Sequence, residues 1–279
     1  MKIAILGTGA IGSAFAFQLS KAGHDVTAIA RGEREKQLRA DRAIVTVRGE
    51  RASVEVAGQL DVTKPYDLVL VTVLAPQVSA VLPALKESSA KKVMFMFNTF
   101  DSLEPLREAV GAHRFLFGFP QGVLGRLIDG KLKFQLMPGS AVSDAEWAKV
   151  FGEAGICCTV EADMHSWLRS HAALVIPLMA SAVRSLEKPI SWAEAREYAK
   201  AFDTGFSIVR ELGHQVKPAY LSALSRLPTS VITFTIWAMS RTATQRELGM
   251  LGPAEARMLI DMMSKAAPLR AEPLLAIRP

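Results

Sequence analysis

The spacing of apolar residues changes within the chain. In the first part, apolar runs of strand length alternate with segments of helical composition, and from Met164 onward apolar residues recur at helical spacing for about six turns. Strands alternating with helices predict an open α/β sheet, and the later period predicts a second, all-α domain. The predicted strands are Lys2–Leu6, Asp25–Ala30, Asp67–Val73, Lys92–Phe97 and Ile156–Val160, with a hairpin over Ile44–Val47 and Ser53–Val56.

The second part of the sequence predicts helices only. After its first long helix, Ser191 and Glu194 form a capping box for another helix, which Gly213 ends. Because a single core rarely grows beyond about 250 to 300 residues, a chain of 279 residues accommodates two domains, which we place at 1–162 and 163–279. Further helices are predicted over Pro218–Leu224, Ser230–Met239 and Pro253–Ala266.

A glycine-rich turn follows the first predicted strand at once. Its sequence is Gly7-Thr8-Gly9-Ala10-Ile11-Gly12, a G-x-G-x-x-G pattern that opens a helix before the next strand. In such a unit the first glycine permits the tight turn, the second lets a pyrophosphate approach the backbone, and the third lets helix and strand pack closely. Since a helix N-terminus attracts anions, these six residues are predicted to bind a dinucleotide, with a glycine turn that has no ligand as the alternative.

Arg31 stands where the second strand ends, the place that normally contacts the ribose of the adenosine. An acidic residue there favours NAD because it accepts hydrogen bonds from the 2′-hydroxyl, whereas a cation suits the 2′-phosphate of NADP. Arg34 and Lys36 follow closely, and Glu33 and Glu35 dilute the positive charge. We therefore predict NADP as the cofactor, with a solvated basic loop as the alternative interpretation.

The carboxyl ends of two later strands are expected beside the same crevice. Thr72, Val73 and Leu74 end one predicted strand and Asn98 ends the next, so all four are predicted cofactor contacts. Asn98 is also a candidate for contact with the substrate, or it is a turn residue that precedes a helix. Capping boxes for two helices of this domain are predicted at Asp101 with Glu104 and at Ser143 with Glu146.

Composition and charge narrow the classes of function. Half of the residues are hydrophobic and 22% are charged, a balance typical of a globular protein with ample core. The two cysteines, Cys157 and Cys158, are adjacent, so neither a disulfide framework nor a metal site is indicated. No apolar run reaches the roughly 20 residues that span a bilayer, and we expect a cytoplasmic protein without membrane contact. The net charge of +6 comes without a nucleic-acid-binding motif, which favours an anionic small molecule as the partner.

These motifs resemble the ketopantoate reductase (2-dehydropantoate 2-reductase) family. The resemblance rests on the N-terminal Rossmann unit with Arg31, the asparagine that ends a later strand, and the long helix that opens a helical domain. It implies an α/β Rossmann domain that binds NADP, then an all-α domain for substrate binding and dimerisation, so that a homodimer is allowed. Two segments look like a divergent branch of the family, Phe117-Gly118-Phe119-Pro120-Gln121-Gly122 and Trp167-Leu168-Arg169-Ser170-His171.

Several residues that the family leads us to expect are replaced. Leu74 stands in place of a lysine near the cofactor, and Arg169 matches the catalytic lysine on the first helix of the second domain. Ala173 and Pro177 stand in place of two asparagines that follow that lysine at helical spacing. The resemblance therefore implies that fold and cofactor carry over to this chain, whereas recognition of pantoate does not.

By the same resemblance, the catalytic residues are Arg169 and Glu247. Glu247 matches a glutamate near the C-terminus, with a surface glutamate as the alternative, and Thr235 takes the place of a substrate-binding serine. The predicted substrate contacts are Asn98, Arg169, Ala173 and Thr235.

Reduction of a ketone builds negative charge on the carbonyl oxygen, so the site needs a cation or donor and also a proton. An arginine can polarise a carbonyl or clamp a carboxylate, but with a pKa above about 12 it is a poor source of the proton. A helical projection places Arg169 with Ile176 and Ala180, away from the apolar face, which fits a side chain in a cleft or an ordinary exposed arginine. His171 is a candidate for the proton donor, because an unperturbed histidine pKa of about 6.5 suits proton transfer near neutrality. The same projection puts it on the apolar face, which favours a core or domain-interface residue.

The sequence thus predicts an NADPH-dependent oxidoreductase that acts on a small 2-keto acid or a related carbonyl compound, and not on ketopantoate itself. The alternative is a catalytically inactive NADP(H)-binding sensor or regulatory protein, which Leu74, Ala173 and Pro177 favour. A nucleic-acid-binding function has only the basic charge behind it.

Overall fold

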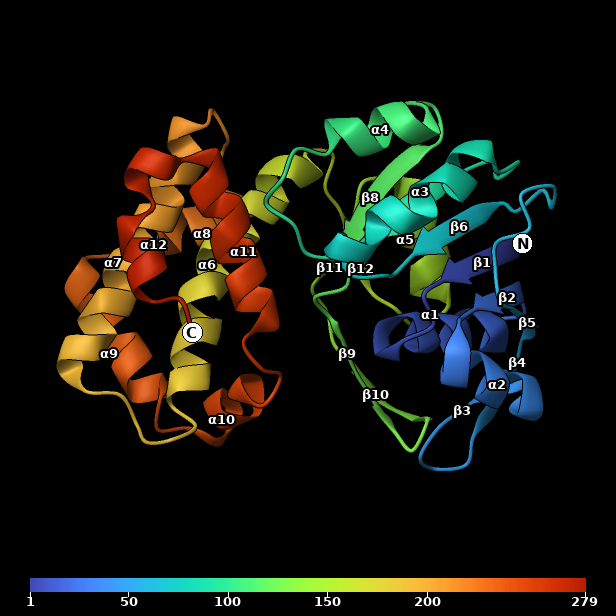
Figure 1. The fold of residues 1–279 in the computed structure, drawn as a ribbon, viewed down its shortest axis with the longest axis horizontal. Helices are drawn as coiled ribbons and strands as arrows, with labels where there is room; N and C mark the ends of the chain where they lie inside the picture. The colour runs from blue at the N-terminus through green and yellow to red at the C-terminus, as the bar shows by residue number, and fades with distance from the viewer. The chain divides into compact units, whose positions relative to one another are not determined.

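The computed structural model describes all 279 residues, which form two compact units (Figure 1). The first unit comprises Met1–Phe97 and Leu103–Met164, and the second comprises Asn98–Ser102 and His165–Pro279. The boundary that we predict after residue 162 assigns residues 98–102 to the first domain, whereas the structure groups them with the second unit. The helical unit therefore receives five residues from within the α/β sequence.

An eight-stranded sheet forms the first unit, in the order β12-β11-β8-β7-β6-β1-β2-β5 (Figure 1). All neighbouring strands are parallel except β8 and β11. The central strands β1, β6 and β7 are buried almost throughout, which explains why they read as continuous apolar runs. The strands are β1 (Lys2–Leu6), β2 (Asp25–Ile29), β5 (Glu55–Ala57), β6 (Leu68–Val71), β7 (Val93–Met96), β8 (Phe115–Phe119), β11 (Ser140–Val142) and β12 (Cys158–Val160).

Helices and two small hairpins complete the first unit. One hydrophobic core joins the sheet to α1 and α5, where the rings of Phe15 and Phe151 meet edge to face with centroids 5.2 Å apart. The hairpins are β3 (Ala43–Val45) with β4 (Arg51–Ser53) and β9 (Val123–Ile128) with β10 (Lys131–Leu136). The helices are α1 (Ala10–Lys21), α2 (Gly32–Asp41), η1 (Ala75–Gln77), α3 (Val78–Glu87), α4 (Glu104–Val110) and α5 (Ala145–Glu153).

The second unit consists of helices (Figure 1). The predicted capping box of α7 is confirmed, since the Ser191 hydroxyl accepts from the N–H of Glu194 and the Glu194 carboxylate accepts from the N–H of Ser191. None of the helices of the protein has the length and apolar character needed to cross a membrane. The helices are α6 (Met164–Arg184), α7 (Trp192–Glu211), α8 (Ala219–Leu224), α9 (Thr229–Met239), α10 (Ala243–Gly249), α11 (Ala254–Ala266), η2 (Pro268–Arg270) and α12 (Glu272–Ala276).

The fold class predicted from the sequence is confirmed: an α/β Rossmann sheet precedes an all-α region. The predicted hairpin is wrong in its second strand, because β4 ends at Ser53 and Glu55–Ala57 pairs with β2 in the main sheet. Val54 lies between β4 and β5, and its N–H donates to the carbonyl of Arg42. A short apolar run therefore indicates a strand without indicating its partner.

Two of the predicted helix caps are also wrong. The N-cap of α4 is Leu103, without a side-chain hydrogen bond, and not Asp101. The N-cap of α5 is Asp144, whose carboxylate accepts from Trp147 at 3.1 Å. Ser143 is engaged elsewhere, because its hydroxyl accepts from the N–H of Phe117 in β8. Ser143 and Asp144 are both residue types that cap helix N-termini, so the sequence alone does not distinguish them. The hydrogen bond of Ser143 to β8 leaves Asp144 as the cap.

The predicted division of α6 into a buried and an outward face is wrong. Ile176 and Ala180, which the projection places outward with Arg169, are fully buried in one cluster with residues of α7, α9 and α11. Gly205 of α7 lies so close to α6 that a Cβ on it would be 3.2 Å from the Cβ of Ala173. A helix that is covered on several sides has no single apolar face for a projection to find.

Candidate functional site

The glycine loop leaves the carboxyl end of β1, which pairs with β2 on one side and β6 on the other. Ligands of open α/β sheets bind at this kind of switch point. Gly7 has a φ of 103°, and a Cβ on it would lie 2.7 Å from Cγ1 of Val73. A Cβ on Gly12 would lie 2.4 Å from the carbonyl oxygen of Gly7 and 2.5 Å from Oγ1 of Thr72. Both positions therefore require glycine for the loop to close.

Gly9 has the opposite surroundings. It is the N-cap of α1, no side chain caps the helix there, and a Cβ on Gly9 would meet no atom within 4 Å. The first N–H groups of a helix have no acceptor within the helix, so this end of α1 offers donors and positive potential beside open space. The loop thus fits the pyrophosphate of a dinucleotide, which needs a close approach to the backbone.

The strand that follows supports this loop from the side. The hydroxyl of Thr72 donates to the carbonyl of Gly7 at 2.8 Å, and Val73 packs against Gly7. Leu74 is 68% exposed at the start of η1, where its N–H donates to the side chain of Gln77. The structure brings together these predicted cofactor residues: Gly7, Thr8, Gly9, Ala10, Ile11, Gly12, Thr72 and Val73.

The three cations that follow β2 have different surroundings. Arg31 is exposed at the N-cap of α2 and makes no hydrogen bond or ion pair. Lys36 pairs with Glu33 on the surface at 2.7 Å. Arg34 turns toward the glycine loop, where its Nε donates to the carbonyl of Thr8 at 3.1 Å and burial lowers the pKa of its guanidinium. Arg31 is therefore the cation of this group that is open to a ligand.

A second set of chemical groups lies in the helical unit, around Asn98–Ser102, where Asn98 is buried, Arg169 is half-buried and Glu255 is exposed. Nδ2 of Asn98 donates to Oε1 of Glu255 in α11 at 2.9 Å. Nε of Arg169 in α6 donates to the carbonyl of Phe100 at 3.1 Å, with the guanidinium carbon 4.9 Å from the centre of the Phe100 ring. An amide, a cation and a carboxylate thus share one short segment, and we call Asn98, Arg169 and Glu255 the helical-unit cluster.

Two polar groups of this cluster are open to further bonding. Burial lowers the pKa of Arg169 and the carboxylate of Asp101 raises it, and the side chain remains a cation at neutral pH. The contact with Phe100 uses only Nε, so both terminal nitrogens of Arg169 are without hydrogen bonds. Oδ1 of Asn98 is buried without a partner, and a buried acceptor of this kind is normally satisfied. The cluster can therefore accept one hydrogen bond and offer a fork of donors.

The other predicted residues of the second unit lie elsewhere. Glu247 is exposed on α10 and makes no hydrogen bond or ion pair. The hydroxyl of Thr235 donates to the carbonyl of Val231 within α9, and Ala173 is 1% exposed against α7. The carboxylate that meets Asn98 is instead Glu255, which cannot be recognised from the sequence because nothing local distinguishes it from other acidic residues in a first helical turn.

His171 does not replace the missing proton donor. Its ring stacks on Trp167 at 5.1 Å, and burial lowers its pKa to about 4. At neutral pH the imidazole is therefore uncharged. The buried position agrees with the prediction from periodicity.

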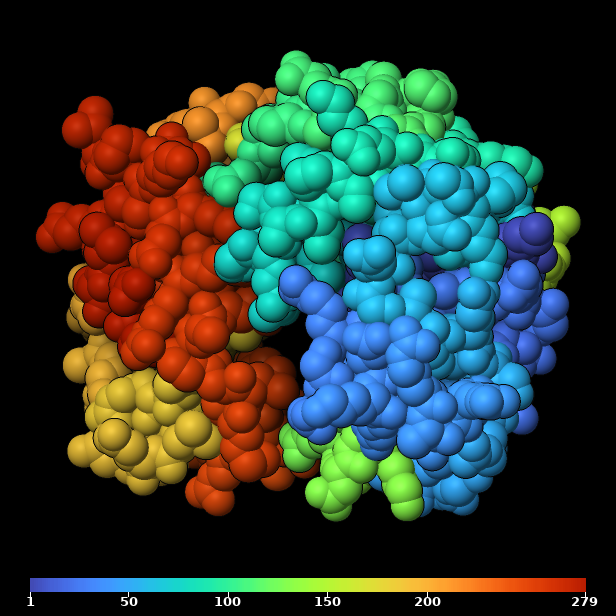
Figure 2. Space-filling view, turned by 45° about the vertical axis from the view of Figure 1, so that its right-hand side comes forward, coloured from blue at the N-terminus to red at the C-terminus, as the bar shows by residue number.

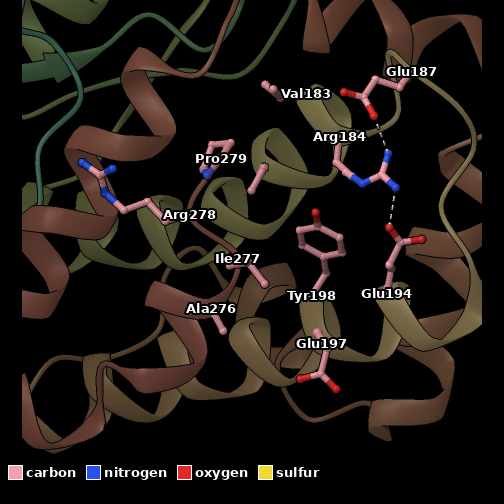
Figure 3. A pocket seen from close by; sticks show the side chains of 11 residues that line it. Val183, Arg184, Glu187, Glu194, Glu197, Tyr198, Ala276, Ile277, Arg278 and Pro279 are labelled. Atoms are coloured by element: carbon pink, nitrogen blue, oxygen red, sulfur yellow. Dashed lines mark hydrogen bonds and ion pairs between the residues drawn. The ribbon is translucent and has the colours of Figure 1, made fainter.

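A separate cavity of about 450 Å³ lies within the helical unit, lined by α6, α7 and the last residues of the chain (Figure 3). Arg184 on its wall is paired with Glu187 and Glu194. The hydroxyl of Tyr198 points into it, and burial raises the pKa of this hydroxyl to about 12. The cavity contains none of the predicted site residues, and both arginines that line it, Arg184 and Arg278, are already paired with carboxylates.

The fold and the glycine loop define a dinucleotide-binding protein of the Rossmann class with a helical second part. A family model described as ketopantoate reductase PanE/ApbA matches residues 3–142, half of the chain. The chain belongs to the ketopantoate reductase family, a family of oxidoreductases, as its sequence motifs predict.

Known relatives agree with this assignment. A 2-dehydropantoate 2-reductase of Vibrio cholerae is 34% identical over 120 residues, which are 42% of this chain and 38% of that enzyme. The structure of a PanE/ApbA family ketopantoate reductase from Ralstonia eutropha has a TM-score of 0.75 at 17% identity, covering 100% of this chain and 97% of that one. The structure of D-mandelate dehydrogenase with NADH and anilino(oxo)acetate has a TM-score of 0.70 at 14% identity, covering 100% and 98%. The two structures share the fold, and the match to the curated enzyme spans less than half of its length.

Proposed function

We propose that this protein is an NADPH-dependent reductase of a small 2-keto acid or a related carbonyl compound other than ketopantoate. The observation that carries the proposal is the helical-unit cluster, in which Asn98, Arg169 and Glu255 gather on one segment. Reduction of a carbonyl needs a cation or hydrogen-bond donor for the developing oxyanion and a group that delivers a proton; in this proposal Arg169 and Glu255 take these two roles.

In this proposal the first unit holds the cofactor. The N-terminus of α1 binds the pyrophosphate beside Gly9, where the space is open. Arg31 pairs with the 2′-phosphate, because it is exposed and has no partner of its own. When bound, NADPH supplies the hydride. One structure of the same fold, D-mandelate dehydrogenase, is bound to NADH, so the preference for NADPH in this proposal rests on Arg31.

The second unit holds the carbonyl substrate. The two terminal nitrogens of Arg169 form a fork that matches a carboxylate, and they also stabilise negative charge that develops on the carbonyl oxygen. Arg169 cannot deliver the proton because it stays charged. Glu255 is the group of the cluster that can carry a proton, and its hydrogen bond from Asn98 fixes the orientation of its carboxyl group.

The surroundings of α6 support a substrate other than ketopantoate. The family leads us to expect asparagines where this chain has Ala173 and Pro177, and Ala173 is packed against Gly205 in the helical core. No polar side chain can then reach a substrate from these two positions. A smaller or less polar keto acid needs fewer such contacts.

Replacing Glu255 tests the proposed reaction. Glu255→Gln keeps the hydrogen bond with Asn98 but holds no transferable proton, so kcat with NADPH is expected to fall about 100-fold. Glu247→Gln is the matched control on another helix and is expected to keep its activity. Turnover is measured with a panel of 2-keto acids and simple ketones. Equal activity of both variants would remove Glu255 from the mechanism, and inert substrates throughout, with NADPH still binding, would favour the inactive sensor.

Replacing two glycines separates support of the loop from binding of the cofactor. Gly12→Ala places a methyl group against backbone, so the free energy of unfolding is expected to fall by about 2 kcal/mol or more. Gly9→Ala enters open space, so stability is expected to hold while the affinity for NADPH and NADH falls. Chemical denaturation and nucleotide titration measure the two effects. A stable Gly9→Ala variant with unchanged nucleotide affinity contradicts the placement of the pyrophosphate.

A further inference from the structure

Arg34 connects the glycine loop to the turn of the β9–β10 hairpin. On the loop side, its Nε donates to the carbonyl of Thr8 at 3.1 Å and its Nη2 donates to the hydroxyl of Ser13 at 2.8 Å. On the hairpin side, its Nη1 donates to the carbonyl of Gly130 at 2.7 Å and to Oε1 of Gln37 at 2.8 Å. Four of the five N–H donors of the guanidinium are therefore used, and one of the acceptors, the carbonyl of Gly130, lies 96 residues after Arg34 in the sequence.

Further hydrogen bonds hold the glycine-loop side of this network in place. The hydroxyl of Ser13 donates to the same carbonyl of Thr8 at 3.2 Å, and the N–H and hydroxyl of Thr8 both donate to the carbonyl of Ile29. Because the peptide group is planar, fixing the carbonyl of Thr8 fixes the plane that enters Gly9, the N-cap of α1. Arg34 thus holds the peptide that precedes the proposed phosphate site.

On the hairpin side, the turn packs closely on the side chain of Gln37. Asp129 and Gly130 have positive φ values of 46° and 73° and form the two-residue turn between β9 and β10. A Cβ on Gly130 would lie 1.7 Å from Nε2 of Gln37, so glycine is needed for the side chain of Gln37 to lie on this turn. Figure 2 shows the hairpin, in bright green, lying against the blue surface formed by the α2 region. The hairpin also approaches α1, since a Cβ on Gly125 would be 3.1 Å from the carbonyl of Ala10.

We infer that Arg34 is a positioning residue for the dinucleotide, through which the hairpin turn holds the glycine loop in its binding geometry. The inference rests on the proposed function only in assigning the dinucleotide to this loop. The inference gives different roles to Arg31 and Arg34, although they are three residues apart. Arg31 binds the 2′-phosphate, whereas Arg34 holds the loop that binds the pyrophosphate. Since NADPH and NADH share the pyrophosphate, loss of Arg34 weakens both to the same extent.

The test compares Arg34→Met with Arg39→Met in the full-length protein. Arg39 lies on the same helix and pairs only with Glu35 on the surface, so it is the matched control. Arg34→Met is expected to weaken both NADPH and NADH on the order of tenfold, with the ratio of the two affinities unchanged. Arg34→Lys, which keeps the charge but not the fork, is expected to recover part of this loss. Calorimetric titration with each nucleotide gives the affinities.

Hydrogen exchange of the protein without nucleotide provides a second measurement. Amides of residues 9–14 and 124–132 are expected to exchange faster in Arg34→Met than in Arg39→Met. Loss of NADPH affinity alone would make Arg34 a ligand of the 2′-phosphate and overturn the inference, as would unchanged affinity for both nucleotides or unchanged exchange in both segments. If the unmodified protein binds neither nucleotide, the proposed function fails, and the exchange data still decide whether Arg34 holds the loop.

Discussion

Arg31→Asp is expected to reverse the nucleotide preference of the protein. The ratio of NADPH to NADH affinity should fall by about 100-fold or more, since a charge-assisted hydrogen bond to phosphate is replaced by repulsion between two anions. The aspartate should also accept hydrogen bonds from the 2′-hydroxyl of NADH, which raises the affinity for NADH. Titration of both nucleotides at fixed ionic strength measures the ratio, because exposed charge pairs weaken with salt.

Lys36→Asp provides the control for this result. It makes the same change of charge five residues later, on a side chain that is already paired with Glu33. The nucleotide ratio should change little in this variant. A similar change in both variants would mean that the general field of the region sets the preference and not a contact of Arg31. If the ratio of NADPH to NADH affinity is unchanged in Arg31→Asp, the proposal that the protein prefers NADPH loses its support.

Arg169→Ala is expected to abolish most of the reductase activity. Removing one group that stabilises charge on a reacting oxygen lowers kcat by about 100- to 1000-fold. Arg169→Lys should retain reduction within about tenfold, because a lysine supplies a charge at the same place and can also give up a proton. Steady-state rates with NADPH and the best 2-keto acid of a panel measure both variants.

Arg184→Ala is the matched control for Arg169. Arg184 lies on the same helix but is paired with Glu187 and Glu194 beside the separate cavity. Its replacement should leave kcat within about twofold of the unmodified enzyme, apart from a loss of stability on the order of 1 kcal/mol at most for partly exposed pairs. If Arg169→Ala reduces substrates as well as the unmodified protein does, the arginine is a structural contact of Phe100 and nothing more.

The sequence is most informative where the physical cause is local. The glycine loop follows a strand directly, and the same few residues that make the motif also make the turn, so their positions follow from the sequence. The second long helix shows its cap at Ser191 and Glu194, and the structure has both hydrogen bonds. The β9–β10 hairpin was within reach of the same reasoning, because Asp129 and Gly130 are a common signal for a two-residue turn.

The helical-unit cluster could not be found in this way. Asn98 and Glu255 are 157 positions apart, and neither residue has neighbours that indicate the other. The different surroundings of Arg31 and Arg34 are equally hidden, since both are arginines of one basic loop. Arg34 turns inward through contacts that include the carbonyl of Gly130, 96 residues away. The two faces of α6 were misplaced for a related reason, because Ile176 and Ala180 owe their burial to helices that follow later in the chain.

The exchange of residues 98–102 between the two units has a consequence for how the protein can be divided. The chain crosses from one unit to the other at 97/98, at 102/103 and at 164/165. A fragment that begins at residue 165 would contain all of α6 except its first residue and every later helix. It would nevertheless lack Phe100, a fully buried member of the helical core, and Asn98, the partner of Glu255. The two units therefore cannot be separated by a single cut, because the helical unit is complete only with residues 98–102, which come from within the sequence of the α/β unit.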